Sequence, residues 1–127
     1  RIACIIGAVQ GIGHAIALRL ATDGCNVSVG DLPAKMSLLE ELVKEIQSKG
    51  RKAIAIPVDV TKENEVDNLV SSTVTNLSRL DIMVANVGVA TLGTVGPALA
   101  LKMPPNSSPA SIEELERVHA VNVKGTF

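Results

Sequence analysis

Apolar and amphipathic stretches alternate along the whole chain of 127 residues. Short runs of mostly apolar residues indicate strands at 2–6, 26–30, 53–58 and 81–86, and the first run is apolar enough for a strand that is buried on both faces. Between these runs apolar residues recur every three or four positions, as in helices that pack by one face. In the first predicted helix that face carries Ile12, Ile16 and Leu20.

Turn and capping residues predict where the helices begin and end. Gly24 and Gly50 follow the first two helices and favour helix termination. Thr61 is the predicted N-cap of the third helix, whose apolar positions are Val66, Leu69, Val70, Val74 and Leu77. Ser111 and Glu114 form a capping box for a last helix, which we expect to continue to the end of the chain with Asn122 on its apolar side.

The resulting order, β-α-β-α-β-α-β-loop-α, predicts an α/β fold with a doubly wound parallel sheet. Right-handed crossovers then favour the strand order 3-2-1-4. We expect residues 1–127 to be one domain without its C-terminal strands, so the fourth strand would lie at an exposed sheet edge. The segment 87–110 is rich in Gly, Pro and Ser and is long for a connection in a compact domain.

Charge and cysteine content narrow the class of protein. The net charge of −1 favours neither a nucleic-acid partner nor an anionic membrane. No apolar run approaches the roughly 18 residues of a membrane span, and no signal peptide is recognisable. Cys4 and Cys25 could form a disulfide or be reactive, but two buried thiols in a reducing compartment fit better. We therefore expect a cytoplasmic protein.

Three glycines, Gly7, Gly11 and Gly13, connect the first strand to the first helix. The carboxyl end of this strand is where a doubly wound sheet opens a crevice, and a helix N-terminus there offers unpaired N–H groups. A pyrophosphate reaches those groups only if no side chain intervenes. We interpret the three glycines as a turn residue, an approach residue and a packing residue; the alternative is a turn without a ligand.

Two carboxylates follow later strands. Asp31 comes 18 residues after Gly13, where a carboxylate can bind the ribose diol of a dinucleotide. The same carboxylate would repel the 2′-phosphate of NADP. That phosphate has no obvious basic partner nearby, since the nearest cation is Lys35. Asp59 could accept a hydrogen bond from the adenine amino group while Val60 packs against the ring. The alternatives are a solvated turn for Asp31 and helix entry for Asp59.

These residues resemble the short-chain dehydrogenases/reductases over the whole chain. The markers are GAVQGIG at 7–13, Asp31, DVT at 59–61, ANVG at 85–88 and VNVKGTF at 121–127. The resemblance implies a Rossmann-like fold that binds NAD, with NADP as the alternative. It implies cofactor contacts from Gly7, Gln10, Gly11, Ile12, Gly13, Asp31, Asp59, Val60, Asn86, Val87 and Gly88.

The resemblance also implies an oxidoreductase that transfers hydride between nicotinamide and a carbonyl or alcohol. Asn122 matches the family's helix asparagine, which distorts its helix and holds a water of the proton relay. The catalytic Ser, Tyr and Lys of the family lie beyond this position, and the chain contains no tyrosine. We therefore expect an N-terminal fragment, inactive by itself, of a protein that is a homo-oligomer when complete.

The chain departs from the family pattern at three places. Ile6 stands where Thr is usual, Val87 replaces Ala, and the segment 87–110 is several residues longer than expected, with 103–109 as the excess. A second function also fits the residues, namely a dinucleotide-binding module without catalysis that serves as a sensor or partner subunit. A Tyr-x-x-x-Lys pair further along the native chain would favour the enzyme.

Overall fold

The computed structural model describes residues 1–90 and 111–127. The chain divides into two compact units, Arg1–Val87 and Gly88–Phe127. Most of the predicted long connection, including 103–109, lies outside the described residues. Among the residues described, no helix has the length and apolar character needed to cross a membrane.

The first unit is built on a sheet of four parallel strands. They are β1 (Ile2–Ile6), β2 (Asn26–Asp31), β3 (Ala53–Pro57) and β4 (Ile82–Ala85). Their order is β3-β2-β1-β4, which confirms the predicted 3-2-1-4 arrangement. All five residues of β1 are buried, because this strand is flanked by β2 and β4 and covered on both faces.

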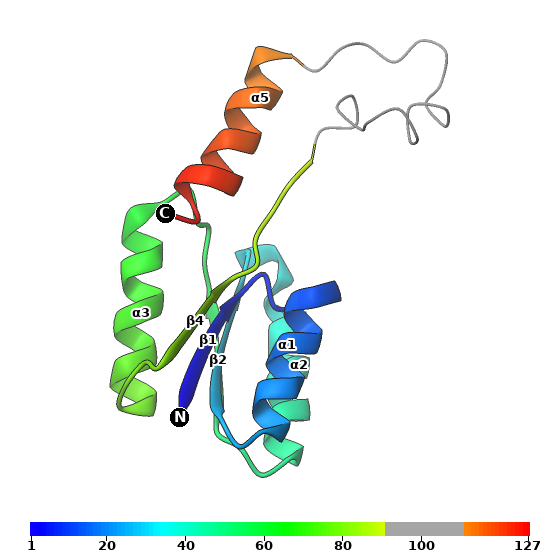
Figure 1. Ribbon diagram of the computed structural model, residues 1–127, viewed down its shortest axis with the longest axis vertical. Coiled ribbons are helices and arrows are strands. Elements are labelled where there is room, and N and C mark those ends of the chain that lie inside the picture. The colour runs from blue at the N-terminus through cyan, green and yellow to red at the C-terminus, as the bar shows by residue number, and fades with distance from the viewer. Residues whose placement is uncertain (91–110) are drawn as a thin grey trace. The chain divides into compact units, whose positions relative to one another are not determined.

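Helices cover both faces of this sheet (Figure 1). Helices α1 (Gly11–Thr22) and α2 (Met36–Ser48) lie on one face, and α3 (Glu63–Leu77) lies on the other. A short 3-10 turn, η1 (Pro33–Lys35), leads from β2 into α2. Apolar side chains fill the space on each side of the sheet in two separate clusters, as a doubly wound fold requires.

The buried face of α1 is shifted by one residue along the sequence from the predicted face. Ile12 is 72% exposed, whereas the residues that face the sheet are Gly13, Ala17 and Ala21. Side chains this small allow the helix backbone to approach the strands closely, and a bulky residue does not fit there. The apolar pattern marked the larger residues and therefore placed Ile12 on the wrong side.

The start and the buried face of α3 also differ from the prediction. Its N-cap is Lys62 and makes no side-chain capping bond, so the assignment of Thr61 as the cap is wrong. Val74 is 41% exposed, and the neighbouring Thr73 is buried instead. The Thr73 hydroxyl donates to the carbonyl of Leu69 at 2.7 Å and can accept from the hydroxyl of Ser28 at 2.9 Å, which satisfies its hydrogen bonding inside the core.

Both cysteines are buried and free, which confirms the interpretation as buried thiols. Cys4 lies on β1 beside Ser28 and Thr73. Burial raises the pKa of the Cys4 thiol, although the hydrogen bonds with the two hydroxyl groups oppose this effect. The thiol is therefore held neutral within the core.

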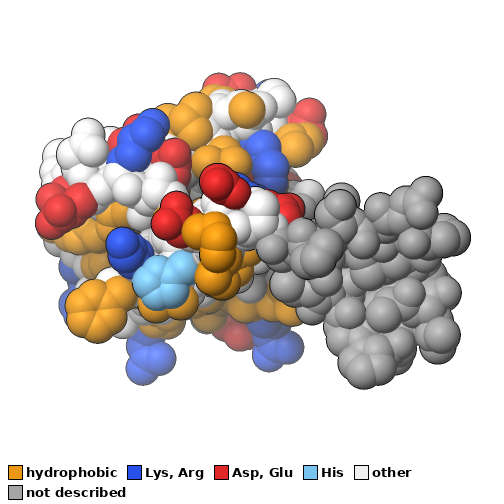
Figure 2. Space-filling model, turned by 90° about the horizontal axis from the view of Figure 1, so that it is seen from above, with side chains coloured by type: hydrophobic (Ala, Val, Ile, Leu, Met, Phe, Trp, Pro, Cys, Tyr) orange, Lys and Arg blue, Asp and Glu red, His pale blue; other side chains and the backbone are white. Residues whose placement is uncertain are grey.

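The second unit contains α5 (Ile112–His119) and a following π-helical turn, η2 (Ala120–Lys124). The predicted capping box at Ser111 and Glu114 is present. The helical backbone continues past His119 to Lys124, near the end of the chain as expected, but its hydrogen-bond ladder widens to the π form, as the bond from the Gly125 N–H to the Ala120 carbonyl shows. This widening includes Asn122, for which the resemblance implied a distorted helix. Several apolar side chains of this unit are exposed, and Figure 2 shows hydrophobic side chains at the surface of the molecule.

The exposed edge at β4 sets the expected stability of this segment alone. Among the residues that the structure describes, β4 pairs with β1 alone, and Met83 on it is 44% exposed. We expect residues 1–127, expressed by themselves, to unfold in urea with a free energy below about 5 kcal/mol, the usual minimum for an intact domain. A cooperative transition above that value would contradict this expectation.

Met83→Lys should reduce light scattering by aggregates, because a charge on an edge strand opposes further strand pairing.

Candidate cofactor site

The chain turns sharply between β1 and α1, and its own backbone excludes side chains from the inside of this turn. Gly7 has a φ of +77°, a conformation that favours glycine. A Cβ atom on Gly7 would lie 2.5 Å from the main-chain oxygen of Asn86, and one on Gly13 would lie 2.1 Å from the oxygen of Gly7. Gly7 is thus a turn residue and Gly13 a packing residue, as the sequence predicted.

The first turn of α1 presents main-chain N–H groups that are free to bind a ligand. Gln10 is the N-cap residue, and its side chain makes no capping hydrogen bond. In the part of the chain that the structure describes, no group accepts from the N–H of Gly11, Ile12 or Gly13. A Cβ atom on Gly11 would meet nothing within 4 Å, so the approach is open. Because a helix N-terminus carries partial positive charge, this surface suits a phosphate.

Asp31 ends β2 beside this turn and is only 7% exposed. Its Oδ1 accepts from the N–H of Leu32 at 2.9 Å, and its Oδ2 lies 3.4 Å from the N–H of Val9. The ammonium of Lys35 lies 3.3 Å from Oδ1. The tertiary structure therefore places Asp31, the residue predicted to bind the ribose, against the glycine turn. The burial of Asp31 argues against the alternative that it is a solvated turn residue.

Asp59 follows β3 and is held by the loop that leads into α3. Its Oδ1 accepts from the hydroxyl of Thr61 at 2.7 Å and from the N–H of Thr61 at 3.0 Å. These two bonds hold the pKa of Asp59 below its ordinary value. Its own N–H donates to Glu65, and the Lys62 ammonium lies 3.8 Å from Oδ2. The carboxylate is thus ionised at neutral pH, with Oδ2 able to accept from a ligand.

The loop after β4 supports the glycine turn from the other side. The Asn86 side chain donates from Nδ2 to the Gly7 carbonyl at 3.2 Å, and its main-chain N–H donates to the carbonyl of Ile6. Val60 and Val87 are half-buried against the apolar cluster beneath α3. The buried side chain of Ile6 belongs to the same cluster.

In the second unit the side chain of Asn122 lies within η2, the π-helical turn, and holds the main chain of Val89. Its Oδ1 accepts from the Val89 N–H at 2.8 Å, and its Nδ2 donates to the Val89 carbonyl at 2.9 Å. A Cβ atom on Gly88 would lie 3.8 Å from Oδ1, an ordinary contact distance. Both ends of the amide are therefore used to hold the main chain of Val89, and a contribution to a proton relay stays a prediction.

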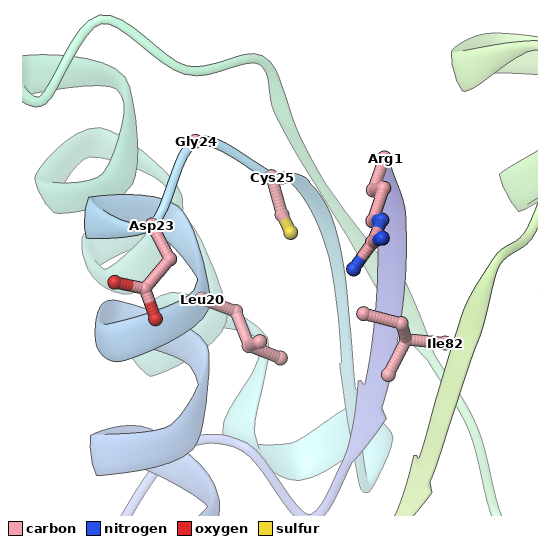
Figure 3. A pocket seen from close by; sticks show the side chains of 6 residues that line it. All are labelled: Arg1, Leu20, Asp23, Gly24, Cys25 and Ile82. Carbon is pink, nitrogen blue, oxygen red and sulfur yellow. The ribbon is translucent and has the colours of Figure 1, made fainter.

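A hollow of about 380 Å³ lies at the opposite end of the sheet from the glycine turn (Figure 3). It is lined at the amino ends of the strands and the end of α1 by Arg1, Leu20, Asp23, Gly24, Cys25 and Ile82. Open parallel sheets bind ligands outside the carboxyl ends of their strands. The glycine turn and the two carboxylates lie at that other end, so the hollow is not the candidate site.

Comparison with known proteins identifies the protein family of this chain. The family model described as short chain dehydrogenase matches residues 1–127. This chain belongs to the short-chain dehydrogenase family. The strand order 3-2-1-4 is thus that of a short-chain dehydrogenase sheet.

Three known proteins show how much of a short-chain dehydrogenase is present. The short-chain dehydrogenase/reductase eriH of Hericium erinaceus is 41% identical, covering 99% of this chain and 46% of eriH. An (S)-acetoin-forming diacetyl reductase from Staphylococcus epidermidis is 39% identical, covering 98% of this chain and 43% of the reductase. A crystal structure of 3-ketoacyl-(acyl-carrier-protein) reductase from Brucella melitensis complexed with NADH matches with a TM-score of 0.79 and 29% identity, covering 99% and 45% of the two chains. The chain spans less than half the length of each.

Two contacts at Asp31 were not predicted from the sequence. Lys35 is the nearest cation, and its spacing of four residues from Asp31 was the available signal for their ion pair. The spacing is informative only if the intervening residues form a turn, as they do in η1. The contact from the Val9 N–H spans 22 residues and had no signal in the sequence, because it depends on the packing of β1 beside β2.

The hydrogen bonds of Thr61 lead to a prediction for Asp59. Thr61→Val should raise the pKa of Asp59 because the hydroxyl donor is lost, whereas Thr61→Ser should leave it close to that of the unchanged protein. A depressed carboxyl pKa stabilises the folded state above the pKa of the unfolded chain, and this contribution is lost as the pH falls through the folded pKa. The two variants should therefore differ in stability near pH 7 and converge once the pH falls below the lowered pKa of Asp59 in the folded state. Carboxyl-carbon NMR titration measures the pKa, and an unchanged value in Thr61→Val would contradict the assignment.

Proposed function

We propose that this chain is the nucleotide-binding part of an NAD(P)-dependent oxidoreductase that prefers NAD. The observation that carries the proposal is the open glycine turn with its free N–H groups beside the buried carboxylate of Asp31. A dinucleotide offers complementary groups, a diphosphate for the N–H donors and a ribose diol for the carboxylate. Membership of the short-chain dehydrogenase family supports the same conclusion.

The residues divide the binding of the dinucleotide among themselves. Gly11, Ile12 and Gly13 donate to the diphosphate through their main-chain N–H groups, and Gln10 stands at the rim of that surface. Asp31 accepts from the adenosine ribose, while Asp59 accepts from the adenine amino group with Val60 beside the ring. Asn86 keeps Gly7 in the conformation that leaves the turn open. Val87 and Gly88 would contact the cofactor further along.

Chemistry at the far end of the cofactor needs groups beyond these. A bound nicotinamide dinucleotide supplies hydride transfer to a carbonyl or from an alcohol. Within this chain Asn122 contributes to that step by holding the main chain of Val89 in place. The proton donor is expected outside these 127 residues, since the chain contains no tyrosine. We expect the whole protein to be a homo-oligomer and to act on a small alcohol or ketone.

The preference for NAD has a direct test in the whole protein. Asp31→Ala should weaken NAD binding by about tenfold or more, because a charge-assisted hydrogen bond to a ribose hydroxyl is lost. NADP binding should weaken less or improve, because repulsion between the carboxylate and the 2′-phosphate is removed. Isothermal titration calorimetry with each dinucleotide measures both. Asp23→Ala, which removes a carboxylate that Arg19 pairs with at the far end of α1, is the matched control. Equal losses for both dinucleotides in Asp31→Ala would refute the ribose assignment.

The glycine turn allows a second test with a matched pair. Gly11 and Gly50 both have a positive φ, +57° and +75°, and both have open space where a Cβ would lie. Alanine at either position should therefore cost a similar strain, roughly 1 kcal/mol of folding stability. Only Gly11→Ala should weaken dinucleotide binding, by about tenfold, because its methyl group stands between the phosphates and the N–H groups. If Gly50→Ala weakened dinucleotide binding as much as Gly11→Ala does, the loss of binding would come from lower folding stability, and the dinucleotide site would not be at Gly11.

A further inference from the structure

The carboxylate proposed to bind ribose is already paired with a cation from its own loop. Lys35 ends η1, and its ammonium lies 3.3 Å from Asp31 Oδ1. The side chain of Asp31 is 9% exposed and that of Lys35 is 34% exposed. The carboxylate is thus held in place by the protein, whereas part of the lysine side chain is in contact with solvent. Lys35 can therefore turn its ammonium toward a second partner while Asp31 stays fixed.

The position of this ammonium matters for what Asp31 can bind. A ribose hydroxyl that donates to Oδ1 would lie about 2.7 Å from that oxygen, and so within about 6 Å of the Lys35 nitrogen. A group attached at the adenosine 2′ position would fall inside the reach of the flexible lysine stem. The three N–H bonds of an ammonium suit a phosphate that carries a charge of about −2.

The charges at this point decide between the two dinucleotides. An unpaired, buried carboxylate repels a 2′-phosphate strongly, because little water screens it. Pairing with Lys35 offsets that repulsion and supplies a positive partner for the phosphate. The Leu32 N–H holds Oδ1, and the Val9 N–H lies 3.4 Å from Oδ2, so the carboxylate keeps its place if the ammonium moves to a ligand.

We propose that Lys35 is a specificity-determining residue that lets the site accept a 2′-phosphorylated adenosine as well as an unmodified ribose diol. The proposal rests on the proposed function, because it assumes that Asp31 faces the adenosine ribose. It deepens that function because a site that would bind NAD alone now binds both NAD and NADP, and the ammonium of Lys35 is the group that allows NADP to bind. Asp31 selects the diol, and Lys35 admits the phosphate.

The experiment is calorimetric titration of the whole protein with NAD and with NADP, and with adenosine 2′,5′-bisphosphate against adenosine 5′-phosphate as smaller probes. Lys35→Gln should weaken NADP binding by about tenfold and leave NAD binding within about threefold, or tighter. The two smaller probes should show the same difference, which places the effect at the 2′ position. Lys35→Arg should retain most of the NADP binding, because the positive charge is kept.

Lys44→Gln on the exposed side of α2 is the matched control, since it removes the same charge from the neighbouring helix. It should change neither dissociation constant by more than about twofold. A ratio of NADP to NAD affinity that is the same in Lys35→Gln and the unchanged protein overturns the role of Lys35 alone. If the unchanged protein binds neither dinucleotide, or if Asp31→Ala has no effect on either, the proposed function fails and this inference fails with it.

Discussion

The close contact between the start of α1 and the ends of β1 and β4 is the constraint on which the rest of the site depends. At Gly7 and Gly13 the approach is so close that a Cβ atom would overlap a main-chain oxygen. This contact directs the free N–H groups of α1 toward the crevice at the carboxyl ends of the strands. The Asn86 side chain bonded to the Gly7 carbonyl holds the contact from the neighbouring strand. A methyl group at either glycine would push the helix outward and move every donor with it.

The parallel sheet then gathers the other groups without any further device. Residues at the carboxyl ends of parallel strands lie at the same end of the sheet, so Asp31, Asp59 and Asn86 share that end with the glycine turn although they are far apart in sequence. Each is fixed by its own local hydrogen bonds: Asp31 by the N–H of the next residue, and Asp59 by Thr61. Ligand binding at such a site needs little reorganisation, because the acceptors and donors are already held in place.

Much of this arrangement was predictable from local sequence. The apolar runs marked the four strands, and their alternation with helices implied the parallel order that the structure has. The two errors about buried helix faces share one cause: apolar periodicity ranks residues by size and polarity, whereas close packing selects them by fit. Gly13 rather than Ile12 faces the sheet in α1, and Thr73 rather than Val74 faces it in α3. The π-helical turn around Asn122 also left no mark in the periodicity, because one extra residue in a turn shifts the pattern too little to recognise.

The sequence by itself determined the strands, the connection type and the identity of the chemical groups at the strand ends. These follow from local propensity and from the position of each residue relative to a strand end, and neither requires knowledge of distant contacts. Only the tertiary structure decided how the groups are paired. Lys35 meets Asp31 through the geometry of a 3-10 turn, and the Val9 N–H lies near it across two neighbouring strands. Distances between side chains depend on packing and register, which pattern alone does not encode, and those distances set the charge that a ligand would meet.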